Sequence, residues 1–174
     1  MTDHVFNVLF LCTGNSARSV LGESILRKDG AVRFHAFSAG SRPKGAVNPF
    51  AFKVLRAFDY PTDGFRSKSW SEFATANAPK MDFVFTVCDD AAGESCPVWP
   101  GHPISAHWGI EDPAAIEGTD VEKERAFNTA FRYMRNRITT FIALPLASLD
   151  KMALTNRLRD IGQMEGATRT SHGA

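Results

Sequence analysis

The chain has few cysteines, no excess of charge of either sign and no long hydrophobic run. Its 3 cysteines are an odd number and too few for a disulfide framework in 174 residues, which excludes the disulfide-rich secreted class. With 20 Lys and Arg against 19 Asp and Glu, the formal net charge of +1 gives no general attraction to nucleic acid or to anionic membranes. No apolar run approaches the ~20 residues of a membrane-spanning helix, and the polar residues 1–4 lack the order of a secretory signal. We therefore expect a cytoplasmic protein with reduced thiols.

Short apolar runs alternate with helix-like segments along the chain. The predicted strands are residues 5–11, 32–38, 82–87 and 103–108. The predicted helices are residues 17–29, 49–58, 70–74 and 120–143, with one more within 145–161. This alternation indicates one α/β domain with a parallel sheet, which we assign to residues 1–145. Residues 146–174 are then a C-terminal helical extension that ends in a polar, flexible tail.

The long predicted helix, residues 120–143, is rich in basic side chains, which we interpret as its solvated face. These residues are Lys123, Arg125, Arg132, Arg135 and Arg137. The neutral charge balance and the lack of interleaved aromatic residues argue against a nucleic-acid surface there.

The first cysteine stands at a position suited to chemistry. Cys12 ends the first predicted strand, and a glycine-containing turn at 13–16 leads into the first helix. Such a turn gathers backbone N–H groups and the positive end of the helix dipole into an anion site. Arg18, at C-x5-R spacing, can present a planar fork to two oxygens of a tetrahedral oxyanion. We expect the pKa of Cys12 to be depressed there, with the Ser19 hydroxyl donating to the thiolate. A buried, inert cysteine is the alternative interpretation.

The string CTGNSARS, residues 12–19, resembles the phosphate-binding loop of the low-molecular-weight protein tyrosine phosphatase family, and especially that of its arsenate reductase branch. The resemblance covers roughly residues 5–143. It implies a three-layer, flavodoxin-like fold with a four-stranded parallel sheet of order 2-1-3-4 and helices on both faces. It also implies that Asn15, Glu23 and Ser38 support the loop from behind. The oxyanion-binding residues that it implies are Thr13, Gly14, Asn15, Ser16, Ala17, Arg18 and Ser19.

A proton donor is expected in the segment Trp108-Gly109-Ile110-Glu111-Asp112-Pro113. A thiolate that attacks phosphorus or arsenic needs a proton for the departing oxygen. In the family, the aspartate of a Trp-Gly-x-x-Asp-Pro segment has this role, and Asp112 matches it. An ordinary Asp-Pro turn is the alternative. We interpret the neighbouring Glu111 as a solvated surface charge.

The other two cysteines are Cys88, at the end of the third predicted strand, and Cys96. In a flavodoxin-like order the first and third strands are neighbours, so Cys12 and Cys88 would lie at the same edge of the sheet. On one regular helix the Cα atoms of Cys88 and Cys96 would be about 12 Å apart, whereas a disulfide tolerates at most about 7 Å. Residues 89–95 must therefore loop or unwind if these two cysteines are to pair.

The string CDDAAGESCP, residues 88–97, resembles the redox segment of thiol-coupled arsenate reductases. The resemblance implies that Cys12 attacks arsenate, that Cys88 then attacks Cys12, and that Cys96 finally attacks Cys88. It implies a role in arsenical resistance and an external reductant such as thioredoxin, glutaredoxin with glutathione, or mycothiol. Phosphate and sulfate would mimic arsenate. We expect no tightly bound cofactor or metal, and a monomer or weak dimer.

Three alternatives to this function stay open. A tyrosine phosphatase would use Cys12, Arg18 and Asp112, with the two later cysteines incidental. A non-catalytic oxyanion-binding regulator would turn over neither substrate, although the intact Cys12 argues against it. A structural zinc site could combine Cys88 and Cys96 with His102 or His107, but the spacing lacks the short Cys-x2–4-Cys step of zinc motifs.

The sequence also departs from the family pattern. In some members a potassium ion binds behind the loop through the equivalents of Asn15, Glu23, Ser38 and a later Thr and Asp. Ser67 and Ser69 stand at those last two positions, so a carboxylate is lost and potassium binding is in doubt. Residues 114–115 are both alanine where many tyrosine phosphatases carry an aromatic pair, so phosphotyrosine would be held poorly.

Overall fold

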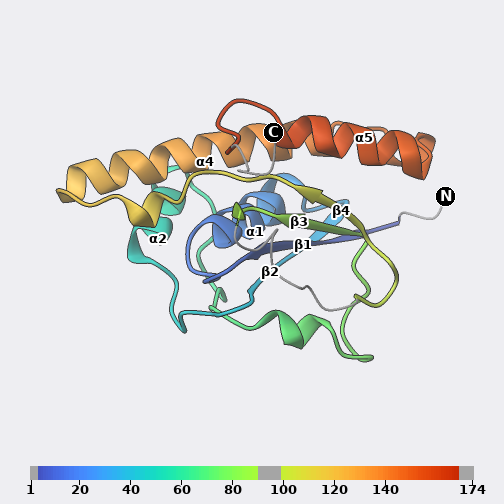
Figure 1. The fold of residues 1–174 in the computed structure, drawn as a ribbon, viewed down its shortest axis with the longest axis horizontal. Helices are drawn as coiled ribbons and strands as arrows, with labels where there is room; N and C mark the ends of the chain where they lie inside the picture. The colour runs from blue at the N-terminus through green and yellow to red at the C-terminus, as the bar shows by residue number, and fades with distance from the viewer. Residues whose placement is uncertain (1–3, 90–98, 169–174) are drawn as a thin grey trace.

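Four parallel strands form the centre of the computed structural model, which describes residues 4–89 and 99–168 (Figure 1). The strands are β1 (Phe6–Cys12), β2 (Phe34–Gly40), β3 (Phe83–Thr86) and β4 (Ile104–His107). Their order is β2-β1-β3-β4, and every neighbouring pair is parallel. This confirms the predicted topology of order 2-1-3-4. Because Cys12 pairs with Gly40 and Leu11 with Thr86, the carboxyl ends of three strands meet at one edge of the sheet.

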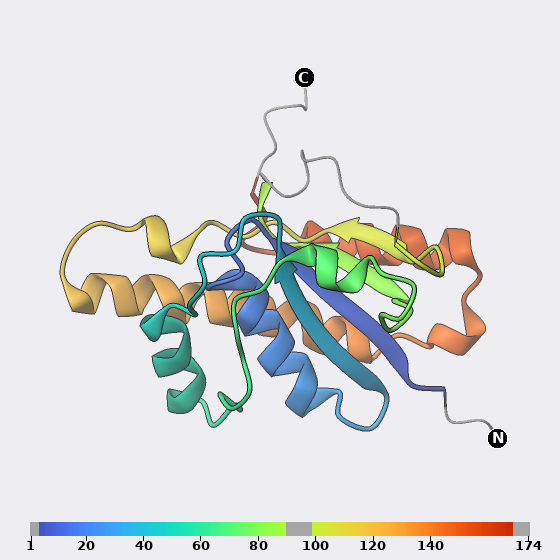
Figure 2. The same ribbon diagram turned by 90° about the horizontal axis from the view of Figure 1, so that it is seen from below.

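Within the described residues, the α-helices pack on one face of the sheet and a short 3-10 helix packs on the other. The longer ones are α1 (Arg18–Asp29), α2 (Pro49–Ala57), α4 (Asp120–Ile142) and α5 (Lys151–Gly162), and the short 3-10 helices are η1 (Trp70–Phe73), η2 (Pro113–Ala115) and η3 (Leu146–Ser148). Side chains of α1, α2, α4 and α5 share one core with Val8 and Phe10 of β1. The alternate β1 side chains, Leu9 and Leu11, pack with Phe73 of η1 on the opposite face. Figures 1 and 2 accordingly place η1 across the sheet from α4 and α5.

Helix α5 is packed into the domain through Trp108. The Trp108 ring is buried and stacks on Phe85 with 3.8 Å between ring centroids. Its indole Nε1 donates to the carbonyl of Leu158 in α5 at 3.0 Å. Leu158 itself belongs to the main core. The helical part of the extension is therefore continuous with the hydrophobic core of the sheet domain.

Arg137 corrects one expectation, because it is not on the solvated face of α4. Its side chain is fully buried, at 0% exposure. The guanidinium donates to three carbonyls, those of Tyr133, Met164 and Glu165, each at 3.2 Å. Burial lowers the pKa of Arg137. The chain after α5 folds back over this part of α4 and covers Arg137. The spacing of apolar residues along α4 does not predict such a contact with a distant segment.

No helix within the described parts of the chain combines the length and the apolar character that crossing a membrane requires.

Candidate active site

The loop after β1 is held in a tight turn. Asn15 adopts a left-handed backbone conformation with φ 44°. Gly40, the end of β2, lies directly against the turn: a Cβ there would stand 2.4 Å from the Thr13 carbonyl oxygen. Backbone N–H groups of Arg42 and Lys44 donate to the carbonyls of Thr13 and Gly14 at 2.9 and 3.0 Å. Glycine at position 40 is therefore required for the strand end and the loop to approach each other.

Behind the loop, the Asn15 side chain joins three segments. Its amide nitrogen donates to the hydroxyls of Ser19 and Ser38, both at 2.9 Å. Its carbonyl oxygen accepts from the backbone N–H of Lys68 at 2.9 Å. The structure thus places Asn15 and Ser19 in the buried layer behind the loop. The hydroxyl of Ser67 adds a further bond by donating to the Gly14 carbonyl at 3.0 Å.

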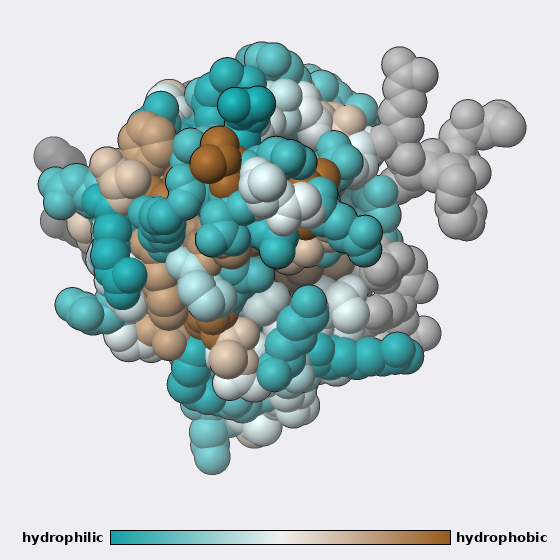
Figure 3. Space-filling view, turned by 90° about the vertical axis from the view of Figure 1, so that its left-hand side faces the viewer, coloured by the Kyte–Doolittle hydropathy of each residue, from teal (hydrophilic) through white to brown (hydrophobic). Residues whose placement is uncertain are grey.

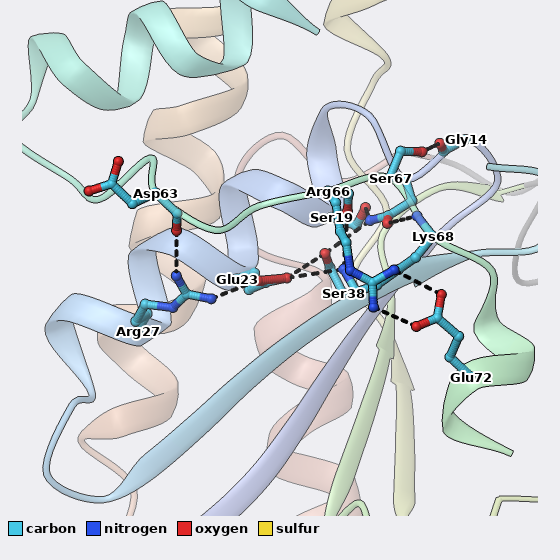
Figure 4. A network of polar contacts seen from close by, with 11 residues as sticks. Gly14, Ser19, Glu23, Arg27, Ser38, Asp63, Arg66, Ser67, Lys68 and Glu72 are labelled. Atoms are coloured by element: carbon cyan, nitrogen blue, oxygen red, sulfur yellow. Dashed lines mark hydrogen bonds and ion pairs between the residues drawn. The ribbon is translucent and has the colours of Figure 1, made fainter. Parts of the chain in front are cut away.

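Glu23 is a buried carboxylate at the centre of this network (Figure 4). Ser38 donates to one of its oxygens at 2.6 Å, and Arg27 contacts the other at 3.0 Å. The Lys68 ammonium lies 3.7 Å from the carboxylate. Burial raises the pKa of Glu23, against the opposing effect of Lys68, Ser38 and Arg27. Burial likewise lowers the pKa of Lys68.

These residues do not fit a potassium ion behind the loop. Two side-chain cations, Lys68 and Arg27, already accompany the Glu23 carboxylate. Ser69 supplies no carboxylate, and its hydroxyl is bonded to that of Ser71 at 2.9 Å. Sequence reasoning missed Lys68. Its position in the sequence could have revealed it, because Lys68 lies between Ser67 and Ser69, which stand where the family has potassium ligands.

In front of the loop is a cavity of about 150 Å³. It is lined by Cys12, Thr13, Gly14, Ser16, Ala17, Arg18, Arg42, Lys44 and Asp112. Figure 3 views the molecule from the left-hand side of Figure 1, where the surface is largely hydrophilic with hydrophobic side chains between. Arg42 and Lys44, which sequence reasoning also missed, make no ion pair among residues 4–89 and 99–168. The cavity therefore combines a thiol with three cationic side chains.

Arg18 is positioned by the segment that carries the expected acid. Its guanidinium donates to the Ile110 carbonyl at 2.7 Å and lies 3.6 Å from the Asp112 carboxylate. The buried Nε of Arg18 has no hydrogen-bond partner among the described residues, which leaves a donor for a bound oxyanion. Asp112 also caps η2, since it accepts from the Ala114 N–H at 2.9 Å. Glu111 lines a neighbouring cavity of about 280 Å³.

The second thiol lies beside the first. Cys12 and Cys88 are both buried, and their thiols lie close enough for Cys88 to be the largest influence on the pKa of Cys12. The Cys88 sulfur also accepts from the Thr13 backbone N–H at 3.3 Å, with the Thr13 hydroxyl 3.5 Å away. The expected nearness of Cys12 and Cys88 is therefore confirmed. Cys96 lies outside the described residues, and so does its pairing with Cys88.

The expected direction of the Cys12 pKa was wrong for this form of the site. The hydrogen bond with Cys88 raises the pKa of Cys12, and burial raises it further. Arg18 and the Gly14 N–H lower it, but by less. The Ser19 hydroxyl, expected to donate to the thiolate, accepts from Asn15. The prediction considered only the loop around Cys12 and left out the effect of the second thiol, Cys88, on the pKa of Cys12.

His107 was one of the residues considered for a structural zinc site, so the contacts of its ring matter here. Both ring nitrogens of His107 are engaged, one with the Thr86 hydroxyl at 2.8 Å and one with the Asp89 carboxylate at 2.7 Å. Within residues 4–89 and 99–168 no cluster of three or more His, Cys, Asp or Glu side chains is placed to hold a metal. His107 is thus committed to protein contacts in this structure.

The fold is a parallel α/β sheet, and the site is a cavity at the carboxyl edge of that sheet, lined by Cys12 and by cationic side chains. Residues 7–153 match the family described as low molecular weight phosphotyrosine protein phosphatase, and the chain belongs to that family. Curated relatives named arsenate reductase, from Oceanobacillus iheyensis and Bacillus licheniformis, are 36% and 37% identical over 134 residues. Each alignment covers 77% of this chain and 93% of the relative. A crystal structure of an arsenate reductase from Archaeoglobus fulgidus superposes with a TM-score of 0.62 at 25% identity, covering 79% of this chain and 99% of the other.

Proposed function

We propose that this protein reduces arsenate to arsenite with electrons from its own thiols. The observation that carries the proposal is the contact between Cys12 and Cys88 at the oxyanion cavity. A phosphatase needs one thiol, whereas reduction by two electrons needs a second within reach of the first. The curated relatives named arsenate reductase support the same assignment.

In the first step Cys12 attacks arsenic. Backbone N–H groups of the loop after Cys12 and the Arg18 guanidinium hold the oxyanion, and the positive charge of Arg18 favours ionisation of the Cys12–Cys88 pair as one thiol proton leaves. The Cys12 sulfur bonds to arsenic, and an arsenic oxygen departs as water after receiving a proton from Asp112. Asp112 fits this role because it lines the cavity that contains Cys12.

In the second step Cys88 attacks Cys12. Cys88 loses its proton to solvent, its thiolate forms a bond to the Cys12 sulfur, and the sulfur–arsenic bond breaks with its electron pair left on arsenic. Arsenic thereby passes from the +5 to the +3 state, arsenite leaves, and the two thiols become one disulfide. The Thr13 N–H, which now holds the Cys88 sulfur, supports this attack by fixing the sulfur beside its target.

In the third step Cys96 attacks Cys88, which frees Cys12 and leaves a Cys88–Cys96 disulfide. An external dithiol such as thioredoxin, or alternatively glutaredoxin with glutathione or mycothiol, supplies two electrons to reduce that bond. All three thiols must be reduced at the start, as the cytoplasm provides. The residues that react in these steps all lie within residues 1–145, and residues 146–174 form the C-terminal extension.

The test is the disulfide that arsenate produces. Arsenate treatment of the reduced protein should yield a Cys88–Cys96 disulfide on peptide mass mapping, and arsenite in equal amount. Cys12→Ser and Cys88→Ser should each abolish arsenite release, while Cys96→Ser should release one equivalent and stop with a Cys12–Cys88 disulfide. Arsenite release that survives without Cys88 would rule out the second step.

Phosphomonoester hydrolysis is the second candidate function, because Cys12, Arg18 and Asp112 line one cavity. It needs neither Cys88 nor Cys96. Hydrolysis of an aryl phosphate by Cys88→Ser, with no arsenite formed by the unmodified protein, would favour the phosphatase. Hydrolysis alongside arsenate reduction would be a residual activity of the shared cavity.

A further inference from the structure

The residue directly after Cys88 is held from two sides. The Asp89 carboxylate oxygen Oδ1 lies 2.7 Å from His107 Nε2 and accepts from the Thr168 hydroxyl at 2.7 Å. The other ring nitrogen of His107 is bonded to the hydroxyl of Thr86, at the end of β3. Asp89 is thus tied to the ends of two neighbouring strands and to the C-terminal extension.

Thr168 is brought to this point by residues 163–168, which we call the strap. Arg137 holds the strap by donating to the carbonyls of Met164 and Glu165. Ala167 forms an antiparallel bridge with Ile110, and the Thr168 N–H donates to the Gly109 carbonyl at 3.2 Å. The strap therefore runs along the segment that carries Asp112 before it reaches Asp89.

Gly109 lies where these groups converge. A Cβ at position 109 would stand 2.2 Å from the Thr168 hydroxyl, 2.7 Å from His107 Nε2 and 2.9 Å from the Asp89 carboxylate. Any other residue would push the three groups apart. The close packing shows that the contact between Asp89, His107 and Thr168 is built into the backbone and does not depend on long, mobile side chains.

The charge on Asp89 is consistent with these contacts. Burial alone would raise the pKa of Asp89, but the hydrogen bonds from Thr168 and His107, together with the charge of Arg18, outweigh burial and lower the pKa. Asp89 is therefore a carboxylate at neutral pH, and a hydrogen bond to a charged acceptor is stronger than one to a neutral acceptor.

We propose that Asp89 is a positioning residue for Cys88, and that the strap, through Thr168, sets the rate at which Cys88 attacks Cys12. The Thr13 N–H holds the Cys88 sulfur beside Cys12, and the contacts of Asp89 with His107 and Thr168 hold the next residue. This inference rests on the proposed function for its part in catalysis. The C-terminal extension thereby supports the second thiol without touching the oxyanion.

The test compares Thr168→Val, which removes the hydroxyl, with Thr168→Ser, which keeps it. All variants carry Cys96→Ser, so that the Cys12–Cys88 disulfide accumulates. Release of arsenite in a single turnover should slow about tenfold in Thr168→Val, the size expected for loss of a hydrogen bond to a charged group. Thr168→Ser should retain the unmodified rate, and so should Thr155→Val, which removes a hydroxyl on α5 far from Asp89 in sequence. Phosphate affinity, a measure of the Cys12 loop, should be equal in all variants.

A second measurement separates this inference from the proposed function. Diamide oxidises neighbouring thiols without arsenate, and formation of the Cys12–Cys88 disulfide with diamide should slow in Thr168→Val by a similar factor. The Cys96→Ser parent protein, if it forms this disulfide with diamide but releases no arsenite, would overturn the proposed function alone. Equal diamide rates in Thr168→Val and in the Cys96→Ser parent, or equal slowing in Thr168→Ser, would overturn the positioning role.

Discussion

At the scale of single residues, the reactivity of Cys12 depends on its neighbour as well as on its loop. A thiol that shares a hydrogen bond with a second thiol loses its proton less readily, and burial adds to this effect. For Cys12 these two causes outweigh the positive charge of Arg18. The contact that the proposed second step uses for the attack of Cys88 therefore also restrains the ionisation of Cys12.

Removal of the Cys88 thiol should shift the ionisation of Cys12. In Cys88→Ala the largest cause that raises the pKa of Cys12 is gone, so this pKa should fall. The rate of Cys12 alkylation by iodoacetamide, followed by peptide mass mapping across pH, should rise at a lower pH than in the unmodified protein. Cys88→Ser keeps a hydroxyl at the site and should show a smaller shift. An unchanged midpoint in Cys88→Ala would contradict this account.

At the scale of elements, α1 differs from the other long helices at its start. Asn48, Thr119 and Asp150 cap α2, α4 and α5 with their side chains, each accepting from a backbone N–H. Helix α1 follows Ala17 and has no side-chain cap. No capping side chain therefore competes for the N–H groups of its first turn, and Ala17 and Arg18 line the cavity, which makes this turn suited to an oxyanion.

Phosphate should therefore stabilise the fold. At ten times its Kd, phosphate should raise the free energy of unfolding by about 1.4 kcal/mol, because it binds only the folded state. Arg18→Lys replaces the planar fork with a point charge and should lose most of this gain at the same phosphate concentration. Arg159→Lys, an exposed change on α5, is the control and should keep the gain. Thermal or urea unfolding with and without phosphate measures the difference, and an equal gain in Arg18→Lys would contradict the assigned site.

Local pattern was sufficient to predict the elements and their order. The first strand extends to Cys12 and not to Leu11, and β3 is shorter than residues 82–87, but each predicted strand and long helix is present. Period and turn residues determine such elements locally. The bond from Thr168 to Asp89 spans 79 positions and the Lys68–Glu23 pair joins separate segments, so neither leaves a local signal.

At the scale of the whole molecule, the C-terminal extension is part of the folded core. Gly162 at the end of α5 lies so close to β4 that a Cβ would stand 2.2 Å from the His107 carbonyl oxygen. Arg137 and Trp108 connect the extension to α4 and to the sheet. The family resemblance, which ends near residue 143, could not foresee this packing, because the extension lies beyond it.

Loss of packing under α5 should destabilise the entire protein. Leu158 is fully buried at 0% exposure, and Leu158→Ala should cost about 2–5 kcal/mol of unfolding free energy. Met152 on the same helix is 76% exposed, and Met152→Ala should change the stability by less than about 0.5 kcal/mol. Urea unfolding that follows a probe in the sheet domain, such as Trp108 fluorescence, measures both. If Leu158→Ala matched Met152→Ala, the extension would be a separate unit.

The buried Glu23 carboxylate has two cationic partners, Lys68 and Arg27, and this has a consequence for the conditions under which the protein works. These cations are side chains of the same protein, so they stay beside Glu23 whatever ions the solvent contains. This holds in dilute buffer, in concentrated sodium salts and in a cell under osmotic stress. The shape of the oxyanion loop should then be indifferent to which monovalent salt surrounds it.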